Sequence, residues 1–250
     1  MQHSSNRLKP ALFVHIQKTA GTSIILEAHK HYGQSIVSHG DCWGKNYQDL
    51  KGIAFISGHV GYDFARPLFR DRFSFTFLRN PIDRVISMYY FCKSQKSSGF
   101  KIYEKANNLS FIEFLKAGFH DPLIKKNIWN NQVWQLAHGY AHLDGRTIDD
   151  FTESELLYLA KANLKSFSYI GLTETFDEDA KKIFAKLNID VDKFPVVNMT
   201  NAKPSVCNIP KEALDMLNHL TKLDSILYAH VLEMRNDFLS HGMLESAVSS

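Results

Sequence analysis

The residues best suited to chemistry lie in a short turn near the N-terminus, from Gln17 to Ser23. The turn follows an apolar run at 11–16 and leads into a stretch of helical composition at 24–31. A strand, a turn of small residues and a helix in this order can bind a phosphate, because the N–H groups of the turn and the positive end of the helix dipole converge on an anion. Lys18 adds a positive charge, and hydroxyl donors come from Thr19, Thr22 and Ser23.

This turn differs from the Walker A loop, which reads G-x-x-x-x-G-K-[ST] and places its lysine directly after the last glycine. Here Lys18 precedes Gly21, and no glycine stands where a Walker loop would begin. Small polar residues are also common before helices. The turn alone therefore leaves open an ordinary strand-to-helix connection with an exposed lysine.

A second set of candidate ligand-binding residues follows the run at 73–78, whose alternation of aromatic and small polar residues predicts a strand. Arg79 comes directly after this run, and Asn80 and Pro81 suit the start of a helix. Ser87 lies two helical turns further on and shares a face with the helix start. The end of a parallel strand is the usual ligand edge of an open α/β sheet, so an arginine and a hydroxyl there suit a terminal phosphate.

Together, the two stretches resemble motifs of the sulfotransferases that use 3′-phosphoadenosine 5′-phosphosulfate (PAPS). Residues 17–23 resemble the 5′-phosphosulfate loop and residues 79–89 the 3′-phosphate motif, in the same order and at a similar spacing. The closest resemblance is to the carbohydrate branch typified by heparan sulfate 2-O-sulfotransferase. One departure is Gln17, where the family more often has proline.

The resemblance implies an enzyme that moves a sulfuryl group from PAPS to an acceptor hydroxyl on a carbohydrate, without a metal ion. It also extends to a loop at 198–204, where Thr200 and Lys203 occupy places that contact PAPS in the family, while Asn198 replaces an arginine. An ordinary polar loop is the alternative for this segment. The donor-binding residues that the resemblance implies are Lys18, Thr19, Ala20, Gly21, Thr22, Ser23, Arg79, Ser87, Thr200 and Lys203.

The transfer also needs a base near neutral pKa, and histidine suits that role best. His59 stands at the end of a predicted strand, and we expect Gly58 and Gly61 to leave room for an acceptor beside it. Its segment also resembles the one that carries the catalytic histidine of the 2-O-sulfotransferase. We therefore predict His59 as the base, and Lys18 as the group that stabilises charge on the leaving oxygen. His15, within the first strand, is expected to be a core residue.

The composition is that of a soluble globular protein. The 250 residues are predicted to form one domain, 1–250. A net charge of +3, from 29 basic and 26 acidic residues, argues against a nucleic-acid partner. The three cysteines lack the spacing of a zinc site or a disulfide framework.

No apolar run has the length of a membrane span, so we expect a cytoplasmic protein or a catalytic domain without its anchor. The sequence predicts no particular oligomeric state.

The elements that must position these residues alternate along the chain. Strands followed by helices predict an α/β, P-loop-like three-layer fold, in which helices flank a mostly parallel central sheet. Besides the first strand, strands are predicted at 53–57, 73–78 and 169–172. Helices are predicted at 125–138, 177–187 and 210–239, and loops at 32–52 and 94–108.

Two other functions stay open at this point. A small P-loop kinase would need a lysine at the Walker position and an acidic residue at a strand end for Mg²⁺. The second and third predicted strands end in 57–59 and 79–80, which supply neither. A nucleotide- or glycan-binding protein without turnover is the second alternative. The acceptor is weakly specified, and a lipid or a small alcohol is an alternative to a carbohydrate. Side chains that could stack on a sugar are Trp43, Tyr62, Trp129 and Trp134.

Overall fold

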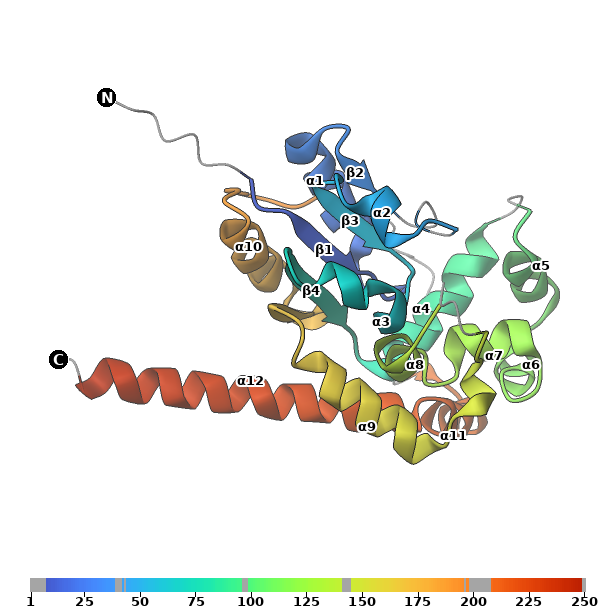
Figure 1. The fold of residues 1–250 in the computed structure, drawn as a ribbon. Helices are drawn as coiled ribbons and strands as arrows, with labels where there is room; N and C mark the ends of the chain where they lie inside the picture. Colours follow the sequence, from blue (N-terminus) through green and yellow to red (C-terminus); the bar gives the residue numbers. More distant parts are fainter. Residues whose placement is uncertain are drawn as a thin grey trace, which may run out of the picture.

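Five parallel strands form the centre of the molecule (Figure 1). The computed structural model of the chain describes residues 8–38, 42, 44–95, 99–140, 145–195, 197 and 208–248, with side chains up to residue 236 in the last helix. The order across the sheet is β2-β3-β1-β4-β5. The strands are β1 (Ala11–Val14), β2 (Ile36–Val37), β3 (Phe55–Gly58), β4 (Phe73–Leu78) and β5 (Tyr169–Leu172).

Strand β1 is the central strand, and both of its faces are buried. Ala11 pairs with Phe55 of β3 on one side and with Phe73 of β4 on the other. Side chains alternate along the strand, so Phe13 enters one hydrophobic cluster and Leu12 enters another. A strand buried on both faces in this way reads as a continuous apolar run.

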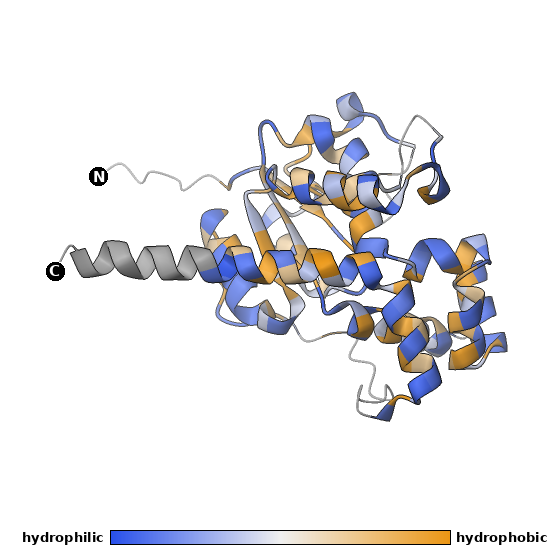
Figure 2. Cartoon of the chain, turned by 90° about the horizontal axis from the view of Figure 1, so that it is seen from below, coloured by the Kyte–Doolittle hydropathy of each residue, from blue (hydrophilic) through white to orange (hydrophobic). Residues whose placement is uncertain are grey.

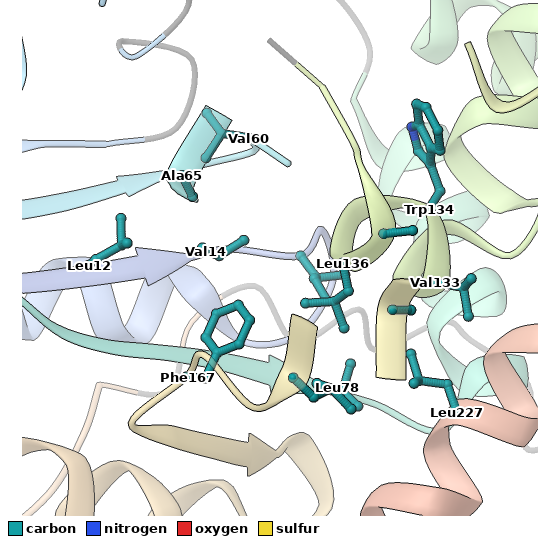
Figure 3. Packing of buried hydrophobic residues seen from close by; sticks show 14 of the residues in the cluster. Leu12, Val14, Val60, Ala65, Leu78, Val133, Trp134, Leu136, Phe167 and Leu227 are labelled. Atoms are coloured by element: carbon teal, nitrogen blue, oxygen red, sulfur yellow. The ribbon is translucent and has the colours of Figure 1, made fainter. Parts of the chain in front are cut away.

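Helices cover both faces of the sheet. One face packs against α1 (Gly21–Tyr32) and α10 (Phe176–Lys186). The other packs against α3 (Tyr62–Ala65), α8 (Asn131–Ala137), α9 (Glu153–Leu164) and α12 (Lys222–Val248). In Figure 3, Val133 and Leu136 of α8 lie close to Leu78 at the end of β4, with Leu227 of α12 nearby.

A third hydrophobic cluster lies beside the sheet and is made by helices alone. Its members are α4 (Pro81–Ser94), α5 (Lys101–Asn108), α6 (Phe111–Ala117), α7 (Pro122–Ile128) and α11 (Lys211–Leu220). The remaining short elements are α2 (Tyr47–Leu50) and three 3-10 turns at Arg66–Leu68, Ile148–Asp150 and Thr173–Thr175. Figure 2 shows hydrophobic and hydrophilic residues mixed along the helices, as expected when one face of a helix is buried.

The predicted fold class is confirmed, because the structure is an α/β fold with a parallel central sheet between helices. The strands at 73–78 and 169–172 have the predicted bounds, and the strand predicted at 53–57 lies at Phe55–Gly58. The helix predicted at 177–187 is α10, shifted by one residue.

Two predicted helices are each broken into two. The helix predicted at 125–138 ends at Ile128 and restarts at Asn131, because Asn130 has a left-handed backbone with φ 40°. The Oδ1 atom of Asn130 accepts N–H groups from the start of α12, so a tertiary contact ends the helix. The helix predicted at 210–239 is interrupted at Thr221, between α11 and α12.

The two predicted loops contain regular structure. The segment at 94–108, predicted as a loop from its polar residues, contains α5, whose Ala106 is fully buried in the third cluster. One buried face is enough to order a short helix whose other face is polar. The segment at 32–52 contains β2 and α2.

Candidate active site

The candidate site lies at the carboxyl ends of β1, β3 and β4. From β1 the chain crosses to the edge strand β2, returns through β3 and then passes to β4 on the other side of β1. The order therefore reverses beside β1, and ligands of open α/β sheets bind outside the strand ends at such a point. The turn after β1, His59 after β3 and Arg79 after β4 all meet at this edge.

The turn after β1 has an unusual backbone. Lys18 and Ala20 both lie in the left-handed region, with φ 70° and φ 63°. This conformation costs a non-glycine residue about 1–2 kcal/mol and persists where the surrounding structure holds it, often at functional sites. The Oγ1 atom of Thr19 donates to the carbonyl of Ile16 at 2.8 Å, and Thr19 is fully buried. The Thr19 hydroxyl was expected to donate a hydrogen bond to a phosphate. In the structure it donates to the main chain and stabilises the turn itself.

The N-terminus of α1 fits an anion. Its N-cap residue is Ala20, which has no side-chain acceptor, and its first turn contains no acidic residue. Thr22 is half-buried and Ser23 is buried in this first turn. A helix start favours a phosphate or sulfate group where its first turn carries no carboxylate, because the N–H groups there carry partial positive charge.

Gly21 is required by a close approach within the turn. A Cβ atom at this position would lie 2.0 Å from the Nε2 atom of His15. The imidazole of His15 is 4 % exposed and stacks on Phe13, with ring centroids 5.0 Å apart. The turn therefore wraps around His15, which is buried as predicted.

Arg79 joins the second motif to the first. Its Nη1 atom donates to the carbonyl of Lys18 at 3.0 Å. Burial lowers the pKa of Arg79 below its usual range, although Asp83 and Glu174 act to raise it, and the guanidinium stays positively charged near neutral pH. The Nζ atom of Lys18 lies 3.6 Å from the ring centroid of Phe91 on α4. Two cationic side chains are thus placed at one turn.

Ser87 lies on the helix that begins after Arg79. The side chain of Asn80 caps α4 by accepting the N–H groups of Ile82 and Asp83, and Pro81 occupies the first turn, as predicted. Ser87 is buried two turns further along α4.

His59 has a defined ring orientation. Its Nδ1 atom lies 3.1 Å from the backbone oxygen of His15. A carbonyl oxygen can only accept, so Nδ1 carries the hydrogen and Nε2 holds the lone pair of the neutral ring. The rings of His15 and His59 lie 4.5 Å apart, and His59 is partly exposed. This tautomer is the one that a base acting through Nε2 requires.

The role expected for Gly61 needs correction. A Cβ atom there would lie 1.9 Å from the carbonyl oxygen of His138 and 2.4 Å from the Cα atom of Gly139. The N–H of Gly61 also donates to the carbonyl of Tyr140 at 3.0 Å. Gly61 therefore makes room for the chain that leaves α8, and not for an acceptor.

Two glutamines of α8 were missed by the sequence analysis. Gln132 binds both backbone polar groups of Arg79, and Gln135 binds the carbonyls of His15 and Val60. The available signal was their spacing of three residues in a short helix whose other residues after Asn131 are apolar. Trp134, weighed for sugar stacking, is 3 % exposed and packs against His138.

Part of the predicted site lies outside the described residues, namely Asn198, Thr200 and Lys203, together with Trp43. Within the described part of the chain, no cluster of three or more His, Cys, Asp or Glu side chains has a geometry that could hold a metal ion. None of the described helices is both long enough and apolar enough to cross a membrane.

The sequence of this chain matches the model of one protein family. The model of the sulfotransferase family matches residues 9–229. The structure is similar to the crystal structure of a sulfotransferase from Alicyclobacillus acidocaldarius, with 16% sequence identity and a TM-score of 0.45, over 86% of this chain and 96% of that chain. Among curated proteins, no sequence matches this chain.

Proposed function

The chain belongs to the sulfotransferase family, and we propose that it transfers the sulfuryl group of PAPS to a hydroxyl of a carbohydrate. The observation that carries this proposal is the bond from Arg79 to the carbonyl of Lys18. It joins two segments that each suit a phosphate, and PAPS differs from ATP in having a 3′-phosphate. We also propose that residues 1–250 form one sulfotransferase domain.

The donor is bound by the two motifs together. The 5′ end of the donor is held by the N–H groups of residues 18–22, which lie in the turn and at the start of α1, and by the hydroxyl of Ser23. Arg79 and Ser87 hold the 3′-phosphate, since a guanidinium pairs well with phosphate oxygens. Thr200 and Lys203 add contacts from the segment outside the described residues. No metal is needed in this scheme, because these donors already neutralise the phosphates.

His59 and Lys18 carry the transfer itself. His59 accepts the proton of the acceptor hydroxyl at Nε2, so that the oxygen can attack sulfur. Lys18 places its ammonium near the bridging oxygen, where negative charge develops as the bond to sulfur breaks. PAPS supplies the sulfuryl group, and the nucleotide product is the 3′,5′-bisphosphate.

Lys18→Met is expected to lower kcat by about 10²- to 10³-fold, because it removes a positive charge from the leaving oxygen. Methionine keeps much of the length of lysine, and the backbone of the turn need not change. The measurement is sulfuryl transfer from PAPS at saturating donor. Lys165→Met is the matched control, because Lys165 precedes β5 at the opposite edge of the sheet and is exposed. A kcat equal to that of the control would contradict the role of Lys18.

Arg79→Ala is expected to weaken binding of the 3′,5′-bisphosphate by about 10- to 100-fold, since a hydrogen bond to a charged group contributes about 1.5–3 kcal/mol. Binding of adenosine 5′-phosphate, which has no 3′-phosphate, should change by much less. Calorimetric titration of both nucleotides gives the ratio of the affinity for the bisphosphate to the affinity for adenosine 5′-phosphate.

The control for Arg79 is Arg70→Ala. Arg70 is exposed and precedes β4, so it lies at the other edge of the sheet. A wild-type chain that preferred ADP with Mg²⁺ over the bisphosphate would overturn the proposal and favour a kinase. A chain that bound PAPS but transferred sulfate to no carbohydrate would leave the acceptor class to be found among lipids and small alcohols.

A further inference from the structure

Helix α8 lies across the ends of the strands that carry the candidate site. Two of its side chains, Gln132 and Gln135, are 1 % and 0 % exposed. Burial of a polar amide is unfavourable unless it is hydrogen-bonded, so the partners of these two amides are informative. In Figure 3 the apolar side chains of the same helix, among them Val133 and Leu136, pack at the end of the sheet.

Gln132 makes two hydrogen bonds to the main chain of Arg79. Its Oε1 atom accepts the N–H of Arg79 at 3.0 Å, and its Nε2 atom donates to the carbonyl of Arg79 at 2.9 Å. Both peptide groups that flank the Cα atom of Arg79 are thereby fixed. This one amide thus binds the main chain on both sides of the position from which the guanidinium extends toward the turn after β1.

Gln135 acts in the same way on the surroundings of His59. Its Nε2 atom donates to the carbonyls of His15 and Val60, both at 2.8 Å. The carbonyl of His15 is also the acceptor for Nδ1 of His59, and Val60 is the next residue in the chain. Gln135 thus fixes the group that orients the imidazole and the main chain beside it.

The start of α8 is itself held by the beginning of α12. The carboxylate of Asp224 accepts the N–H groups of Gln132 at 3.3 Å and Val133 at 2.8 Å. In return, Oδ1 of Asn130 accepts the N–H groups of Leu223 at 2.8 Å and Asp224 at 3.2 Å. This reciprocal capping fixes the helix against the sheet, so the two glutamines act from a rigid support.

We propose that Gln132 and Gln135 are positioning residues for the transfer reaction, with separate tasks. Gln132 sets the place of Arg79 and therefore the affinity for the 3′-phosphate. Gln135 sets the place of His59 and therefore the rate of proton removal from the acceptor. The inference rests on the proposed function, in which Arg79 binds the 3′-phosphate and His59 is the base.

Methionine substitutions separate the two tasks, because methionine has nearly the length of glutamine and no amide. Gln132→Met is expected to weaken binding of the 3′,5′-bisphosphate about 10-fold, with little change for adenosine 5′-phosphate and little loss of kcat at saturating PAPS. Gln135→Met is expected to keep bisphosphate affinity within about twofold and to lower kcat by about 10- to 100-fold, the cost of misplacing a reacting group by about an ångström. Calorimetry and initial rates are the two measurements.

Glutamate substitutions at the same two positions give a second test, because glutamate differs from methionine in volume and charge. Gln132 uses both an acceptor and a donor, and Gln135 uses its donor twice. Glutamate keeps the acceptor and loses the donor. Gln132→Glu should therefore keep more bisphosphate affinity than Gln132→Met, while Gln135→Glu should lower kcat at least as much as Gln135→Met. Thermal unfolding of each variant identifies those that are folded.

The matched control is Asn163→Leu. Nδ2 of Asn163 donates to the carbonyls of Leu136 at 2.9 Å and Ala137 at 3.2 Å, so this amide holds the other end of α8 without touching the strand ends. The Asn163→Leu variant should have a lower melting temperature, but its kcat and its ratio of bisphosphate to adenosine 5′-phosphate affinity should be unchanged. If Gln132→Met, Gln135→Met and Asn163→Leu changed bisphosphate affinity and kcat equally, the positioning roles would be overturned. A wild-type chain without preference for the bisphosphate would instead refute the proposed function.

Discussion

His59→Asn is expected to lower kcat for sulfuryl transfer by about 10²- to 10⁴-fold, the usual contribution of a general base. Asparagine is chosen because its Nδ2 can keep the donation to the carbonyl of His15 that Nδ1 of His59 makes. The variant then lacks the basic Nε2 and little else. The affinity for the 3′,5′-bisphosphate should stay within about twofold of wild type, because we propose that other residues hold the donor. Initial rates with PAPS and calorimetry give the two values.

His29→Asn is the control for this substitution. His29 is exposed in the last turn of α1, at the opposite end of the helix from the turn after β1. It should retain full activity. If His59→Asn kept a wild-type kcat, His59 would not be the base. If it lost bisphosphate affinity in proportion to activity, His59 would instead belong to the donor site.

Asp179→Asn is expected to lower the free energy of unfolding by about 3–5 kcal/mol, as when one partner of a buried ion pair is removed. The carboxylate of Asp179 is fully buried and accepts two bonds from Arg235, at 2.8 and 3.0 Å. It also accepts the hydroxyls of Tyr169 at 2.7 Å and Thr175 at 2.6 Å, and the N–H of Leu172 at 2.8 Å. One residue thus ties α10, β5 and α12 together. Denaturant unfolding measures the loss.

The effect of Asp179 should depend on pH. Burial raises the pKa of Asp179, but the bonds from Arg235, Thr175, Leu172 and Tyr169 outweigh it, so the folded-state pKa lies below the usual 3.8. The stabilisation is therefore complete above pH 3.8 and is lost as the pH falls through the folded-state pKa. The unfolding curves of wild type and Asp179→Asn should converge in strong acid and differ most near neutral pH.

The control for Asp179 lies next to it on the same helix. Glu178 pairs with Lys182 at 2.5 Å, with both side chains at least half exposed. Glu178→Gln should change the free energy of unfolding by less than about 0.5 kcal/mol, as exposed pairs do. Equal losses for the two variants would show that burial does not determine the contribution of Asp179.

The sequence predicted those features that depend on local pattern. The alternation in Phe73–Leu78 gave a strand with the observed bounds, and Asn80 with Pro81 gave the start of α4. The turn at 17–23 and Arg79 were predicted to bind one ligand, and they do lie together. Such features are visible because each residue acts through neighbours a few positions away.

The sequence could not reveal contacts between distant segments. Asn130 ends a helix because its side chain binds the backbone at Leu223 and Asp224, more than ninety residues later. Gly61 is required by the chain at His138, which no local pattern indicates. The same holds for Gln132 and Gln135, whose partners are 53 to 120 residues away. A buried amide in a helix has no sequence pattern that identifies the backbone it binds.

The connection between β4 and β5, which runs from residue 79 to residue 168, has a consequence for how the chain folds. The two segments that we propose to bind phosphate are complete once α4 has been synthesised. Helix α8 comes later, and Asp224 of α12, which caps α8, comes later still. Parallel pairing and contacts between such distant residues raise the contact order and slow folding. The site proposed at this sheet edge therefore reaches its final geometry only after the chain has been synthesised through the start of α12.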